Sequence, residues 1–96
     1  MRLTEYEIDS IKKAFEEVFE GGRVYLFGSR VDDTQRGGDI DLYLVPNATF
    51  DNIRERKIKF LIKLDDSLGE QKIDVVVAQD KNRLIEQEAL KYGVAL

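Results

Sequence analysis

Two aspartates stand at alternate positions inside an apolar run, and this feature constrains the fold more than any other. The run reads Asp39-Ile40-Asp41-Leu42 and continues into further strand-forming residues. Side chains at positions i and i+2 of a strand point to one face, so Asp39 and Asp41 project together while Ile40 and Leu42 face the core. The pattern predicts a strand over residues 39–45 with two carboxylates on one face.

Two like charges about 6–7 Å apart repel each other unless a cation lies between them. Magnesium is the natural candidate, because it prefers hard oxygen ligands and bridges carboxylates to phosphates. The alternative is that Asp39 and Asp41 are polar residues on the solvent face of an edge strand. Strands are depleted in aspartate, and two on one face are rarer still. We therefore favour a metal-binding role.

Two further features support chemistry on a nucleotide. The pair Gly28-Ser29 follows an apolar strand expected over residues 23–27 and offers a small turn that a polyphosphate can approach closely, although Gly-Ser also commonly just ends a strand. Asp74 lies within a β-branched run. By itself Asp74 could instead be a buried acid paired with Lys72 or an arginine, or a residue at the start of a strand.

The order of these motifs closely resembles the nucleotidyltransferase superfamily of DNA polymerase beta. An apolar residue and Gly28-Ser29 are followed, after nine residues, by the Asp39-to-Asp41 motif, and Asp74 supplies a third carboxylate on a later strand. The small size and the Gly28-Ser29-Arg30 form are similar to the minimal nucleotidyltransferases, in particular the MntA-like antitoxins associated with HEPN toxins. The resemblance extends over nearly the whole chain.

The resemblance implies magnesium-dependent transfer of AMP from ATP to a hydroxyl, with a tyrosine of a partner HEPN-domain toxin as the expected acceptor. Asp39, Asp41 and Asp74 would be the catalytic residues and would hold two Mg²⁺ ions. Gly28, Ser29 and Arg30 would bind the nucleotide, although Arg30 could equally be a solvated surface residue. The alternative is a binding module that neutralises its partner by contact. A small enzyme that modifies an antibiotic or a nucleotide is a third, weaker interpretation.

Length and composition limit the alternatives. Ninety-six residues predict one domain, residues 1–96, and the formal charge of −4 argues against broad nucleic-acid binding. The chain has no histidine and no cysteine, so imidazole bases and thiolate metal sites are excluded. No apolar run approaches the length of a membrane span, and we expect a cytoplasmic protein. The sequence is compatible with a homo-oligomer and with a hetero-oligomer.

The remaining pattern predicts an α/β (α+β) fold, the nucleotidyltransferase palm, with a small mixed sheet flanked by helices. A capping box at Thr4 predicts a first helix that ends at Gly21-Gly22. Asp51 or Asn52 would cap a second helix, and Asp80 or Asn82 a third that runs to about residue 91, with a strand over residues 72–78 between them. Basic residues at 54–59 predict a solvated face or, alternatively, a docking surface for an acidic partner. Tyr25 and Tyr43 are expected to pack in the core or at its rim rather than to stack on a base.

Overall fold

Three helices and four strands follow one another as α1-β1-β2-α2-β3-α3-β4 in the computed structural model, which describes residues 3–28, 39–79 and 83–96. The helices are α1 (Glu5–Phe19), α2 (Ile53–Leu68) and α3 (Leu84–Tyr92), and the strands are β1 (Gly22–Phe27), β2 (Ile40–Pro46), β3 (Ile73–Val77) and β4 (Val94–Ala95). The predicted α+β fold is confirmed. The sequence pattern did not predict β4, because two residues are too few to show a periodicity.

The strands form one mixed sheet in the order β3-β2-β1-β4. The central strand β2 pairs antiparallel with β1 and parallel with β3, while β4 pairs antiparallel with the other edge of β1. The parallel β2–β3 pair needs a crossover connection, which α2 supplies. This topology brings the start of β2 and the start of β3 to the same end of the sheet.

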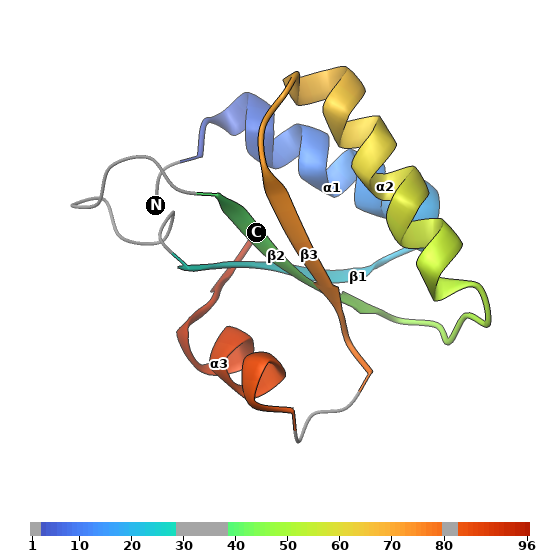
Figure 1. Cartoon of the computed structure of the whole chain (residues 1–96), viewed down its shortest axis with the longest axis vertical. Helices are drawn as coiled ribbons and strands as arrows, with labels where there is room; N and C mark the ends of the chain where they lie inside the picture. Colours follow the sequence, from blue (N-terminus) through green and yellow to red (C-terminus); the bar gives the residue numbers. More distant parts are fainter. Residues whose placement is uncertain (1–2, 29–38, 80–82) are drawn as a thin grey trace.

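Helices lie on both faces of the sheet (Figure 1). Helices α1 and α2 pack side by side on one face, and α3 lies on the other. The hydrophobic core fills the layer between the sheet and the α1–α2 pair, and aromatic rings of α1, α2 and the loop before α2 meet there. Its fully buried side chains include Ile11, Phe19, Leu26, Ile40, Leu42, Leu44, Phe60 and Leu64.

Of the three described helix starts, α1 has the expected side-chain cap, α2 has only the expected N-cap residue, and α3 has neither. The predicted capping box of α1 is present, because the Thr4 side chain accepts from the Glu7 backbone and Glu7 accepts from the Thr4 backbone. Asn52 stands at the N-cap of α2, but its side chain makes no capping bond. Helix α3 has Arg83 at its N-cap rather than Asp80 or Asn82, which lie outside the described residues.

Within the basic segment of residues 54–59, Arg56 makes contacts that hold the fold together. Arg56 donates to the backbone carbonyl of Val18 and to the Asn52 side chain, and its guanidinium lies 3.8 Å from the centre of the Phe50 ring. It therefore ties α2 to the end of α1. Its Nε and Nη1 donors are thus used within the fold, which gives Arg56 a structural role in the basic segment.

Candidate active site

The carboxylates come together because of the register between β2 and β3. Asp41 on β2 is directly opposite Asp74 on β3. Asp39 immediately precedes β2, and the backbone amide of Ile40 donates to the carbonyl of Lys72 at 3.0 Å. Neighbouring strands lie about 4.8 Å apart, so the structure gathers Asp39, Asp41 and Asp74 at one end of two adjacent strands.

The site lies on the face of the sheet that α3 partly covers. Ile40 and Leu42 are fully buried against the α1–α2 layer, so Asp41 points to the opposite face. Tyr43, two residues along the same face, reaches Glu86 of α3. Strand β2 is paired on both sides. The alternative that the two aspartates lie on an edge strand is therefore wrong.

The electrostatics of Asp41 reflect this crowding. Burial raises the pKa of Asp41, and the nearby charges of Asp74 and Asp39 and a hydrogen bond with Asp74 raise it further. Asp39 is instead paired with the Lys72 ammonium, with 3.3 Å between Oδ2 and Nζ. Asp74 is exposed, so the alternative of a buried acid is wrong, and the lysine considered as its partner pairs with Asp39.

Gly28 makes room for the Asp41 carboxylate. Phe27 at the end of β1 is opposite Asp41, and Gly28 follows with φ of +80°. A Cβ atom placed on Gly28 would lie only 2.2 Å from Oδ2 of Asp41. The absence of a side chain at this position therefore allows the carboxylate its observed place. The predicted phosphate-binding residues Ser29 and Arg30 lie outside the described residues.

The donor set suits a divalent cation chemically, because three carboxylates offer hard oxygen ligands. Within residues 3–28, 39–79 and 83–96, however, no group of three acidic side chains is gathered closely enough to hold a metal ion. Asp39 is paired with the Lys72 ammonium. The two Mg²⁺ ions therefore stay a prediction.

A buried acid behind the site was missed at the sequence level. Glu86 is fully buried and accepts hydrogen bonds from the Tyr43 hydroxyl at 2.8 Å and from the Gln79 backbone at 3.1 Å. Burial, followed by the hydrogen bond and the charge of Glu86, raises the pKa of the Tyr43 phenol, which therefore stays protonated and donates. Tyr43 is buried, as predicted, and no local pattern distinguishes Glu86 from a surface glutamate of α3.

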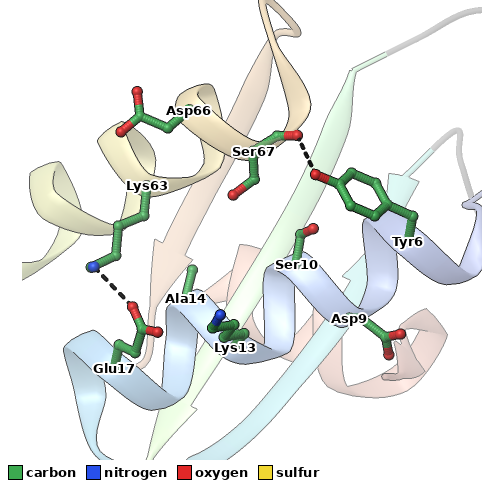
Figure 2. Close-up of a pocket in the computed structure, with 9 residues that line it drawn as sticks. All are labelled: Tyr6, Asp9, Ser10, Lys13, Ala14, Glu17, Lys63, Asp66 and Ser67. Carbon is green, nitrogen blue, oxygen red and sulfur yellow. Dashed lines mark hydrogen bonds and ion pairs between the residues drawn. The ribbon is translucent and has the colours of Figure 1, made fainter.

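A hollow of about 440 Å³ lies between α1 and α2, on the other side of the sheet from the carboxylates. Figure 2 shows its polar lining, in which the Tyr6 hydroxyl donates to the Ser67 carbonyl and Lys63 pairs with Glu17 at 2.8 Å. Charges of both signs line it, and Lys63 and Glu17 neutralise each other. We assign it no role in the chemistry.

An α+β domain with aspartates at the start of two adjacent strands, beside a strand-ending glycine, has the architecture of a nucleotidyltransferase. The family model described as "Polymerase beta, Nucleotidyltransferase" matches residues 9–96. The chain therefore belongs to this family, and its general activity is nucleotidyl transfer. A comparison with curated proteins finds no significant match. Among the described residues, no helix combines the length and apolar character needed to cross a membrane.

Proposed function

We propose that this protein is a protein adenylyltransferase that moves AMP from ATP to a tyrosine hydroxyl of a HEPN-domain partner and so acts as the antitoxin of a toxin–antitoxin pair. Family membership supports nucleotidyl transfer. The minimal Gly28-Ser29-Arg30 form supports the antitoxin subtype by resemblance. The observation that carries the proposal is the register that places Asp41 opposite Asp74, with Asp39 beside them.

The proposal assigns a role to each of the three aspartates. Asp39 and Asp41 would hold the cations, and Asp74 would complete the set. Bound divalent cations supply charge stabilisation on both the attacking and the leaving oxygen of an in-line displacement. Gly28, Ser29 and Arg30 would bind the triphosphate, where backbone amides and a cation suit its charge.

Proton transfer falls to a carboxylate, because the chain has no histidine. Asp74 is exposed on its strand and is opposite Asp41, so an incoming hydroxyl can reach it. We assign Asp74 the removal of the proton from the acceptor hydroxyl as its oxygen attacks the α-phosphorus. The α–β phosphoanhydride bond breaks, and pyrophosphate leaves with the displaced electron pair.

The nucleotide site is tested by ligand-linked stability. We expect ATP and Mg²⁺ together to raise the melting temperature more than the sum of their separate effects, because each completes the other's binding shell. Asp41→Asn should remove this synergy and leave the fold intact. Asp66→Asn, an exposed acid of α2, is the matched control and should keep it. Equal shifts in the wild type and in Asp41→Asn would contradict the assignment.

The transfer itself is tested with labelled ATP and a purified HEPN-domain partner. We expect a covalent AMP label on a partner tyrosine, detected by mass spectrometry, and no label with Asp74→Asn. That variant should still bind the partner, since one carboxylate contributes little to a docking surface. Stoichiometric binding by the wild type without any AMP transfer would sink the enzymatic proposal and favour the contact-only antitoxin.

A further inference from the structure

Among the described residues, Lys72 is a cation that the fold brings to the carboxylate site. It precedes β3 directly, and its carbonyl accepts from the Ile40 amide at 3.0 Å, which fixes its backbone beside Asp39. Its ammonium pairs with Oδ2 of Asp39 at 3.3 Å. The position of Lys72 therefore follows from the same parallel register that brings Asp41 opposite Asp74.

Lys72 acts on more than its direct partner. The charges of Asp74 and Asp39 raise the pKa of Asp41, whereas the charge of Lys72 lowers it. One positive charge thus offsets part of the repulsion among three carboxylates.

The pair is also suited to exchange. The Lys72 side chain is 73% exposed and that of Asp39 is 37% exposed, so water can solvate either group when they separate. Ion pairs of this exposure are weak, and a compact ammonium on a flexible stem leaves easily. A divalent cation that takes the Asp39 oxygens must displace this ammonium.

We propose that Lys72 is a resident counter-ion of the carboxylate site, which holds Asp39 until a divalent cation displaces it and thereby weakens metal binding in the absence of nucleotide. This inference rests on the proposed function, because it takes the three aspartates as the metal ligands. It adds a residue that sets the metal affinity of the site without being a ligand itself. Lys72 is a positioning residue for Asp39.

The test is Mn²⁺ binding to the nucleotide-free protein, measured from the electron paramagnetic resonance signal of free Mn²⁺ at low ionic strength. We expect Lys72→Met to bind Mn²⁺ about two- to fivefold more tightly than the wild type, as fits the loss of one exposed ion pair. Lys72→Arg keeps the charge and should bind like the wild type. The advantage of Lys72→Met should shrink as salt screens the charges.

A matched control separates this effect from a change in net charge. Lys63 pairs with Glu17 at 2.8 Å in the hollow between α1 and α2, so Lys63→Met removes an equivalent charge and an equivalent ion pair elsewhere. Lys63→Met should leave Mn²⁺ binding unchanged. A general loss of fold in Lys72→Met would weaken binding, which is opposite in sign to the expected result.

The outcomes distinguish this inference from the proposed function. If Asp41→Asn abolishes Mn²⁺ binding but Lys72→Met binds no more tightly than the wild type, the counter-ion role is wrong and the metal site stands. If Lys63→Met tightens binding as much as Lys72→Met, the effect is one of net charge and the role is also wrong. If Asp41→Asn binds Mn²⁺ as tightly as the wild type, the proposed metal site is wrong and this inference fails with it.

Discussion

The Asp41 carboxylate occupies the space that a side chain at position 28, just after β1, would need. A Cβ at Gly28 would meet Oδ2 of Asp41 at 2.2 Å, whereas a Cβ at Gly69 would meet nothing within 4 Å. The two glycines have similar positive φ values, +80° and +75°. Gly69 therefore serves as a control that has a positive φ but no crowding by a carboxylate.

We expect Gly69→Ala to cost about 1–3 kcal/mol of unfolding free energy, because φ of +75° with ψ of −166° is a conformation that residues with a side chain rarely adopt. Gly28→Ala should cost about 1–2 kcal/mol more, since the carboxylate must also move. Urea denaturation measures both. The excess should vanish when Asp41→Ala is added to Gly28→Ala, and an excess that persists in the double variant would contradict the assigned contact.

The ionised Asp41 side chain is unfavourable in the folded protein, because it is partly buried beside two other carboxylates. The direction of its pKa shift tells how this affects stability at different pH. The native pKa of Asp41 is raised above the ordinary 3.8, so the native state binds this proton more tightly than the unfolded state does. The corresponding stability is fully present below pH 3.8 and is lost as the pH rises through the native pKa. Ionised Asp41 therefore destabilises the metal-free protein at neutral pH.

Asp41→Asn should remove this cost. At neutral pH without metal we expect its melting temperature to exceed that of the wild type by roughly 2–4 °C, a modest value because the group is partly screened by solvent. The difference should shrink toward zero as the pH falls to the ordinary carboxyl range. A difference that is independent of pH, measured by calorimetry, would argue against charge repulsion as its cause.

Helix α3 depends on a polar contact beneath it. The Tyr43 hydroxyl of β2 and the Gln79 backbone after β3 both donate to buried Glu86, which also lies 3.6 Å from the Arg83 guanidinium. These contacts tie α3 to two strands on the face that carries the aspartates. The element is therefore positioned by hydrogen bonds to a buried charge as well as by apolar packing at Ala89.

Tyr43→Phe should destabilise the protein by about 1–3 kcal/mol, because it removes a hydrogen bond from a buried carboxylate. Tyr6→Phe is the control, since the Tyr6 hydroxyl donates to the Ser67 carbonyl at the surface, and it should cost less than about 0.5 kcal/mol. Chemical denaturation compares the two. Equal losses of unfolding free energy in the two variants would show that the buried hydrogen bond to Glu86 stabilises the protein no more than the surface hydrogen bond of Tyr6.

Across the described sheet, β1 and β2 both have a neighbouring strand on each side, whereas β4 has only two residues and lies at an edge. Local opening needs fewer broken contacts at an edge than at the centre of a sheet. We expect hydrogen exchange to be slowest in β2 and its partner amides of β1, and fastest among the strands in β4. Mass spectrometry of exchange time courses measures this order, and faster exchange in β2 than in β4 would contradict the topology.

Local patterns predicted most of the secondary structure. The alternation around Asp39 and Asp41 predicted β2 and its carboxylate face, and the residues around Thr4 predicted the capping box of α1. These features depend on neighbours within a few positions, which the chain itself displays. The roles of Ser29 and Arg30 were predicted in the same local way and stay predictions, because both residues lie outside the described part of the chain.

The sequence by itself determined the amphipathic helices, the main strands and the aspartates available for chemistry, because each depends on short-range periodicity. Only the tertiary structure decided that Asp41 is opposite Asp74, that Lys72 pairs with Asp39 and that Glu86 is buried under Tyr43. These contacts join residues more than thirty positions apart, and Tyr43 and Glu86 are separated by 43. Strand register and helix placement create them, and no local spacing encodes either one.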